Sequence, residues 1–131
     1  VDTQSWNKAL TGDVMQLAGT NSVFNLEEAD SVIQQRIEAF DISPAAPLWG
    51  RGDERCSGDA LASQEMALTG YKEWCIALEQ HKLDKAYRPL VLQAKNLAWE
   101  WQENNVCLEF SLPAGSYATS IVRELIELIQ Q

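Results

Sequence analysis

The chain has 131 residues, of which 46% are hydrophobic and five are tryptophan, and this composition excludes an intrinsically disordered chain. No apolar run approaches the roughly 20 residues that a membrane-spanning helix needs. The net charge of −9 argues against a chain that holds a polyphosphate by itself, because lysine and arginine supply most of that affinity.

The first quarter of the chain predicts a β-hairpin and then a helix. Alternating residues favour strands over 14–18 and 22–24 around a short turn. Asn25 with Glu28 three residues later is typical of a helix N-cap. Apolar residues at helical spacing extend this helix to about Phe40.

The middle of the chain predicts a loop, a helix and a short strand. Prolines and glycines favour an ordered loop over 42–56. A second helix is predicted over 59–81, and Gly70 inside it favours a kink or a break, since glycine costs about 1 kcal/mol relative to alanine. Residues 86–93 read as a strand, in which Pro89 indicates an edge position or a strand start.

The last third predicts a hairpin and a closing helix. Apolar and polar residues alternate over 97–102 and again over 106–112, which is typical of a hairpin with one apolar face. Trp99 and Trp101 lie on that face, and we expect them to pack in a core. The closing helix extends to about Ile129. Its predicted buried residues are Ile121, Val122, Leu125, Ile126 and Ile129.

Cysteine and histidine are too few for the commonest catalytic and metal sites. The three cysteines lie far apart and form no C-x-x-C pattern, so we expect neither a disulfide framework nor a zinc site, and a reducing cytoplasm is the simplest location. His81 is the only histidine, which leaves Ser-His-Asp catalysis and most transition-metal sites with little to build on. The chain starts at Val1 with no signal-like residues, and we interpret this start as an internal or processed boundary.

One segment is locally basic although the chain is acidic. Between residues 82 and 95 there are four basic residues and one acidic residue. If RNA contacts this chain, we expect it to do so here. The four candidates are Lys82, Lys85, Arg88 and Lys95.

Residues 112–125 are the most informative run, because a turn there joins a strand to a helix. Tyr117 falls in the first helical turn, beside backbone N–H groups that have no partner inside the helix, and such junctions often hold ligands. Two interpretations of Tyr117 stay open: a half-buried packing residue, or a stacking platform for a planar ligand. Ser116 is better explained as a helix N-cap than as a nucleophile, because no G-x-S-x-G motif surrounds it.

Four segments resemble, in the same order, motifs of the TruD family of tRNA pseudouridine synthases. Residues 12–19 resemble G-D-x-x-Q-L-A-G, and residues 47–52 resemble the loop P-L-x-G-x-G. Residues 88–90 together with residues 97–99 resemble the stretch that leads back into the catalytic domain. Residues 112–125 resemble the terminal signature L-P-A-G-S-F/Y-A-T-x-x-V/L-R-E-L, which is the most specific of the four.

The resemblance implies an α+β fold in which hairpins pack with amphipathic helices, as part of a pseudouridine-synthase-type fold. Residues 1–85 would belong to the inserted domain of the family, and residues 86–131 would be the C-terminal hairpin-helix piece of the catalytic domain. The implied activity is the isomerisation of uridine 13 of tRNA to pseudouridine, without a cofactor or a metal. We also predict a cytoplasmic monomer that binds tRNA and no membrane.

The roles of individual residues follow from the same resemblance. Tyr117 aligns with the active-site aromatic residue of the family and would stack on the flipped uracil, while Pro113, Gly115 and Ser116 would shape the turn that places it. The catalytic Asp of the family lies in a G-x-K-D-K/R element, for which this chain has no match, and Asp84 lies in the wrong context. The chain alone should therefore be inactive.

Two other classes of function stay open from the sequence. A non-catalytic RNA-binding or protein-interaction module could keep this fold without the catalytic Asp, and the presence of a G-x-K-D element before Val1 would distinguish the two. A hydrolase that uses Ser116 would need a base within hydrogen-bond reach, and His81 lies on a different predicted element.

Overall fold

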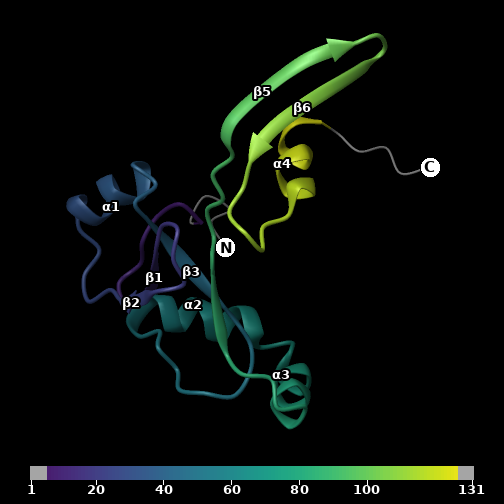
Figure 1. Ribbon diagram of the computed structural model, residues 1–131. Helices are drawn as coiled ribbons and strands as arrows, with labels where there is room; N and C mark the ends of the chain where they lie inside the picture. Colours follow the sequence, from purple (N-terminus) through teal and green to yellow (C-terminus); the bar gives the residue numbers. More distant parts are fainter. Residues whose placement is uncertain (1–5, 127–131) are drawn as a thin grey trace. The chain divides into compact units, whose positions relative to one another are not determined.

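The computed structural model describes residues 6–126, which form two compact units that divide between Val91 and Leu92. The first unit contains β1 (Val14–Leu17), β2 (Val23–Asn25), α1 (Ser31–Glu38), β3 (Ile42–Leu48), α2 (Gly58–Leu68), α3 (Lys72–Gln80) and β4 (Ala86–Pro89) (Figure 1). The second contains β5 (Lys95–Gln102), β6 (Asn105–Ser111) and α4 (Ala118–Leu125). Helices combined with antiparallel strands confirm the predicted α+β class. Within residues 6–126 no helix has the length and apolar character needed to span a membrane.

The first unit is built on an antiparallel sheet with the strand order β2-β1-β3-β4. Successive residues of β1 point to opposite faces of this sheet. Met15 packs in one buried cluster with Ile37 of α1, and Val14 packs in another with Ala60 of α2. The two helices therefore cover different faces of the sheet (Figure 1). Because β1 contributes to both clusters, it is the centre of the core of this unit.

The segment predicted as a loop begins with β3, so the prediction is wrong for residues 42–48. β3 pairs with β1 through residues 42–44 and with β4 through residues 45–48. The Pro44 carbonyl accepts a hydrogen bond from the N–H of Leu90, the residue just past the end of β4. The nitrogen of Pro44, which has no hydrogen to donate, therefore lies at the end of the β3–β4 ladder. The nitrogen of Pro47 faces the β1 side of β3, beyond residues 42–44, which are the ones that pair with β1. Each proline is tolerated because it removes no bond from the middle of a ladder.

β4 forms one edge of the sheet, as Pro89 predicted. Pro89 pairs with Ala45, and the neighbouring residues of β3 direct their backbone groups toward β4. The nitrogen of Pro89 therefore faces the open edge, where no partner strand needs an N–H.

The helices begin and end at residues other than those predicted. α1 starts after Asp30, whose carboxylate accepts a hydrogen bond from the Ile33 N–H at 2.8 Å, whereas Asn25 ends β2. Aspartate satisfies the N-cap requirement as well as asparagine does, so local pattern could not distinguish the two. The predicted helix over 59–81 is two helices, α2 and α3, and the break includes Gly70.

Gly12 and Asp13 form the tight turn that leads into β1. The Leu10 N–H donates to the Asp13 carboxylate at 2.7 Å, and the Asp13 N–H donates back to the Leu10 carbonyl at 3.1 Å. Burial raises the pKa of Asp13, and the bond from Leu10 opposes that rise. Gly12 has a φ of 86°, and a Cβ at this position would overlap the backbone carbonyl of Ser57. The Gly-Asp pair is therefore explained by the backbone geometry of the first unit.

The second unit is the predicted hairpin followed by α4. The pairs Trp99–Leu108 and Trp101–Val106 place their apolar side chains on one face, as the alternation predicted. Within the described residues, however, Trp99 is 65% exposed and Trp101 is 66% exposed, so the expected core packing is absent there.

The apolar stripe of α4 is only partly covered. Ile121 and Val122 are half-buried, as far as the structure describes their surroundings, whereas Leu125 and Ile126 are exposed, contrary to the prediction. Ile129, the last residue of the predicted stripe, lies outside the described residues.

Candidate functional site

The turn between β6 and α4 is a four-residue reversal from Pro113 to Ser116. The Ser116 N–H donates to the Pro113 carbonyl at 3.2 Å. Gly115, the third residue, has a φ of 83°, which is the conformation that a type II turn requires at this position and that glycine adopts without strain. Among residues 6–126, a Cβ at Gly115 would meet no atom within 4 Å, so the positive φ and not a close contact explains the glycine.

Tyr117 lies at the junction where this turn enters α4. It occupies the N-cap position with an extended backbone (φ −106°, ψ 117°), and its carbonyl accepts the Ser120 N–H at 3.0 Å. The prediction that Ser116 caps the helix is therefore wrong, and the side chain of the N-cap residue Tyr117 makes no capping hydrogen bond within the described residues. Tyr117 is 71% exposed, so its ring does not pack in a core within the described residues.

Three of the four basic candidates are exposed residues. Lys82 follows α3, Arg88 lies in β4, and Lys95 begins β5 in the second unit. Lys85 differs, because its side chain is 6% exposed and its ammonium lies 3.0 Å from the Glu54 carboxylate. The charge of Lys85 is therefore compensated inside the first unit.

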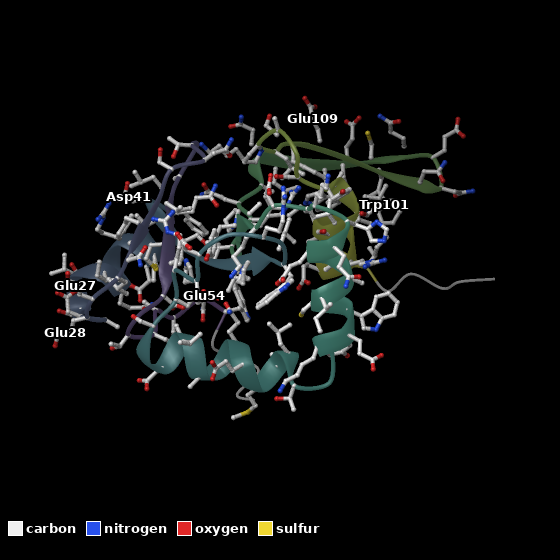
Figure 2. All side chains as sticks on the ribbon, turned by 90° about the horizontal axis from the view of Figure 1, so that it is seen from below. Glu27, Glu28, Asp41, Glu54, Trp101 and Glu109 are labelled. Carbon is white, nitrogen blue, oxygen red and sulfur yellow. The ribbon has the colours of Figure 1, made fainter. Side chains whose placement is uncertain are left out.

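Glu54 is the centre of a polar cluster in the first unit (Figure 2). Its carboxylate accepts hydrogen bonds from Lys85 at 3.0 Å, from the Gln64 amide at 2.7 Å and from the Cys56 backbone N–H at 2.9 Å. Burial by itself raises the pKa of Glu54, but these bonds outweigh it and lower the pKa to about 2. Burial and the nearby Glu54 charge raise the pKa of the Cys56 thiol and of the Tyr87 phenol. Cys56 is thus a packing residue and not an activated thiolate.

Residues 49–52 are held against the segment that follows α3. The Arg51 N–H donates to the Leu83 carbonyl at 2.7 Å, and the Arg51 guanidinium lies 2.7 Å from the Asp84 carboxylate. A Cβ at Gly50 would lie 2.5 Å from the backbone carbon of Asp84, so only glycine permits this approach. The loop that resembles P-L-x-G-x-G, residues 47–52, therefore joins two segments of the first unit. Asp84 forms an ion pair there with Arg51.

Acid is expected to weaken the first unit through Glu54. Because the pKa of Glu54 falls from 4.5 to about 2 on folding, its contribution to stability is present above about pH 4.5 and is lost as the pH falls toward 2. Thermal unfolding followed between pH 5 and pH 2 should show a smaller loss of melting temperature for Glu54→Gln than for the unchanged protein. The difference should be modest, because the Glu54 side chain is partly exposed and water screens its interactions. Glu65→Gln, on the exposed surface of α2, is the matched control. Equal acid dependence in the Glu54→Gln and unchanged proteins would contradict the assignment.

Sequence reasoning missed the Glu54 cluster, and no local signal could have found it. Lys85 lies 31 residues from Glu54 in the chain, and Gln64 lies 10 residues away. The pairing of β4 with β3, together with the backbone hydrogen bonds of Arg51 to Leu83 and Lys85, brings the segment that carries Lys85 beside the loop that carries Glu54. In contrast, Tyr117 and Gly115 could be found because one local motif contains both.

Curated relatives match the chain along nearly all of its length. A protein from Pseudoalteromonas atlantica named tRNA pseudouridine synthase D is 38% identical over 98% of this chain and 37% of its own length. A protein of the same name from Methylococcus capsulatus is 42% identical over 100% of this chain and also 37% of its own length. The chain therefore spans little more than a third of the length of these relatives.

A solved structure and a family model agree with the relatives. A candidate TruD protein from Methanosarcina mazei superposes with a TM-score of 0.69 over 91% of this chain and 31% of its own, at 23% sequence identity, and supports the fold. The family model for tRNA pseudouridine synthase D (TruD) matches residues 1–125, which confirms the resemblance seen in the sequence motifs. Because this match covers almost every residue, the chain belongs to the TruD family of tRNA pseudouridine synthases.

Proposed function

We propose that this chain is part of a tRNA pseudouridine synthase that isomerises uridine 13 of tRNA, and that Tyr117 forms one wall of the site for the target uracil. The observation that carries the proposal is the exposed ring of Tyr117 at the junction of β6 and α4, inside the most specific motif of the family. A base taken out of its stack needs an aromatic wall to replace the lost stacking. An exposed ring on a defined turn supplies such a wall.

The proposed chemistry divides between this chain and the rest of the protein. An aspartate outside residues 1–131 attacks the target nucleoside, the bond between N1 and the ribose breaks, and the uracil turns and rejoins the ribose through carbon 5. The aspartate is then released, carbon 5 loses its proton and N1 takes one up, so that substrate and product have the same atoms. Because substrate and product are isomers, the proposed reaction takes up no net atoms or electrons, and we propose that it uses no cofactor. The chain holds the base through Tyr117 on the turn formed by Pro113, Gly115 and Ser116, and it is inactive without the aspartate.

The two units are proposed to belong to different domains of that protein. The first unit is assigned to the inserted domain and the second to the catalytic domain, because the second unit carries Tyr117. We place the boundary after β4, since β4 pairs with β3 of the first unit.

The proposal is tested with the full-length protein, an unmodified tRNA transcript and carbodiimide labelling of pseudouridine followed by primer extension. A new stop one nucleotide on the 3′ side of position 13 is expected, and a transcript with cytidine at position 13 is the control that should lack it. Binding of tRNA with no pseudouridine at any position would overturn the activity and favour the non-catalytic module. Pseudouridine at another position would overturn only the assignment to uridine 13.

Neutralising the exposed basic candidates is expected to weaken tRNA binding. We replace Lys82, Arg88 and Lys95 with glutamine and omit Lys85, because its partner Glu54 already compensates its charge. Each lost phosphate contact should lower the slope of log affinity against log salt concentration by about 1. Filter binding at several salt concentrations measures this slope.

Two other exposed lysines serve as the control for that experiment. Lys8 and Lys72 lie outside the basic segment, and their replacement by glutamine should leave the slope nearly unchanged. If the triple variant binds tRNA like the unchanged protein, residues 82–95 are not part of the RNA surface.

A further inference from the structure

The strand β5 contains one extra residue near its start. Between the pair Lys95–Ser111 and the pair Ala98–Glu109, β5 advances three residues while β6 advances two. This mismatch is a β-bulge, in which two residues of one strand lie opposite a single residue of the other. Asn96 within it has a φ of 55°, the left-handed conformation that asparagine tolerates better than most residues with a Cβ. The bulge is therefore built on Asn96.

The bulge decides which face of the hairpin carries Lys95. In an unbroken strand Lys95 would share a face with Trp99 and Trp101, because side chains alternate along a strand. The extra residue reverses this orientation, since Lys95 pairs with Ser111 and directly paired residues point to the same face. Ser111 shares its face with Glu109, and Figure 2 shows Glu109 and Trp101 extending to opposite sides of the hairpin. Lys95 therefore lies on the face opposite the tryptophans.

The same pairing brings Lys95 to the end of β6 that leads to Tyr117. Ser111 is the last residue of β6, and the reversal that begins at Pro113 follows two residues later. Residues 111–120, which include this turn and Tyr117, contain no charged side chain. Directly opposite residues have Cα atoms about 5 Å apart, so the strand pairing supplies this end of β6 with the cation that its own sequence lacks.

An ion pair with Glu109 is the simplest alternative role for Lys95, because Glu109 lies on the same face two residues before Ser111. None of the ion pairs among residues 6–126 joins these two side chains. A regular strand would also avoid the positive φ of Asn96, which is strained for a residue with a Cβ. Bulges often re-aim a side chain next to an active site, and the side chain re-aimed here is that of Lys95.

We propose that Asn96 is a positioning residue and that Lys95, placed by its bulge, binds a phosphate of the nucleotide whose base stacks on Tyr117. Lysine binds phosphate by neutralising its charge. Phosphate contacts fix the position of a nucleic acid without reading its sequence, so Lys95 holds the backbone of the nucleotide while Tyr117 receives the base. The inference rests on the proposed function, in which that base is the target uracil.

The first test combines a variant of the full-length protein with a change in the RNA. Lys95→Gln removes the ammonium group, and a methylphosphonate placed in turn at each phosphate that flanks uridine 13 of a synthetic tRNA removes one phosphate charge. At one of these phosphates each change alone should lower affinity by on the order of tenfold, because it breaks a contact between charged groups. The two changes together should lower affinity no further, because they remove the same contact. Lys72→Gln is the control, and its effect should add to that of the methylphosphonate. Additive losses for Lys95→Gln at both phosphates would overturn the proposal.

The second test concerns the bulge. Asn96→Gly accepts the positive φ and should bind tRNA like the unchanged protein. Asn96→Val disfavours it, because valine is β-branched, so the strand should become regular and turn Lys95 to the face of the tryptophans. Its affinity should fall as far as that of Lys95→Gln, and adding Lys95→Gln should lower it no further. Normal affinity in Asn96→Val, with amide exchange showing a formed hairpin, would overturn the positioning role. The measurement on Lys95→Gln stands whether or not Asn96→Val folds.

Binding and turnover separate this inference from the proposed function. A protein that forms pseudouridine but shows additive losses would overturn the phosphate contact alone. A protein whose losses are coupled at uridine 13 but that forms no pseudouridine would overturn the proposed activity and leave the contact standing.

Discussion

Replacing Tyr117 with alanine in the full-length protein is expected to lower turnover on tRNA by on the order of tenfold to a hundredfold, because a base stacked on an aromatic ring gains about 1–3 kcal/mol. The melting temperature should change little, since Tyr117 is 71% exposed and its side chain caps no helix. Single-turnover rates of pseudouridine formation and a thermal melt on the same protein measure both effects.

Two further variants make the Tyr117 result specific. Tyr117→Phe keeps the ring and should retain most of the activity. Tyr71→Ala removes a ring that is 59% exposed at the N-terminus of α3 in the first unit, and it should not reduce turnover. A large loss of melting temperature with normal turnover in Tyr117→Ala would contradict the stacking role and show a packing role instead.

Replacing Gly12 with alanine is expected to destabilise the first unit by on the order of 2–4 kcal/mol, which places it among the severe single substitutions. The new Cβ would overlap the backbone carbonyl of Ser57, and a backbone atom cannot move aside as a flexible side chain can. The φ of 86° adds strain for any residue with a Cβ. Urea unfolding of the full-length protein, read by amide exchange in β1, measures the loss.

Gly19 provides the matched control for Gly12. It also has a positive φ, 71°, but a Cβ there would meet no atom of the described part of the chain within 4 Å. Gly19→Ala should therefore cost only the conformational strain of about 1–2 kcal/mol. Equal costs at the two glycines would show that the close approach to Ser57 does not matter.

Local pattern predicted the elements whose residues carry their own periodicity or turn chemistry. The alternation around Trp99 and Trp101 identified the β5–β6 hairpin, and Gly70 marked the break between α2 and α3. The turn at Gly115 and the aromatic residue after it could be found in one motif because both lie on a single turn. The same run of residues carried the family resemblance.

Local pattern failed where a partner distant in sequence decides the outcome. Residues 42–48 contain two prolines and read as a loop, yet pairing with β1 and β4 makes them a strand. Asn25 and Asp30 are equivalent as N-caps in isolation, and the position of β2 leaves only Asp30 for α1. Lys85 reads as a free cation until the fold places Glu54 beside it.

The sequence by itself determined the α+β class, the hairpins, the TruD family and the turn that carries Tyr117, because alternation, glycine conformation and motif order are properties of neighbouring residues. Only the tertiary structure decided that Glu54 holds Lys85, that Gly12 is needed against Ser57, and that the tryptophans of β5 face outward in the described chain. These outcomes depend on which distant segments pack together, and burial, charge compensation and backbone approach are set by that packing.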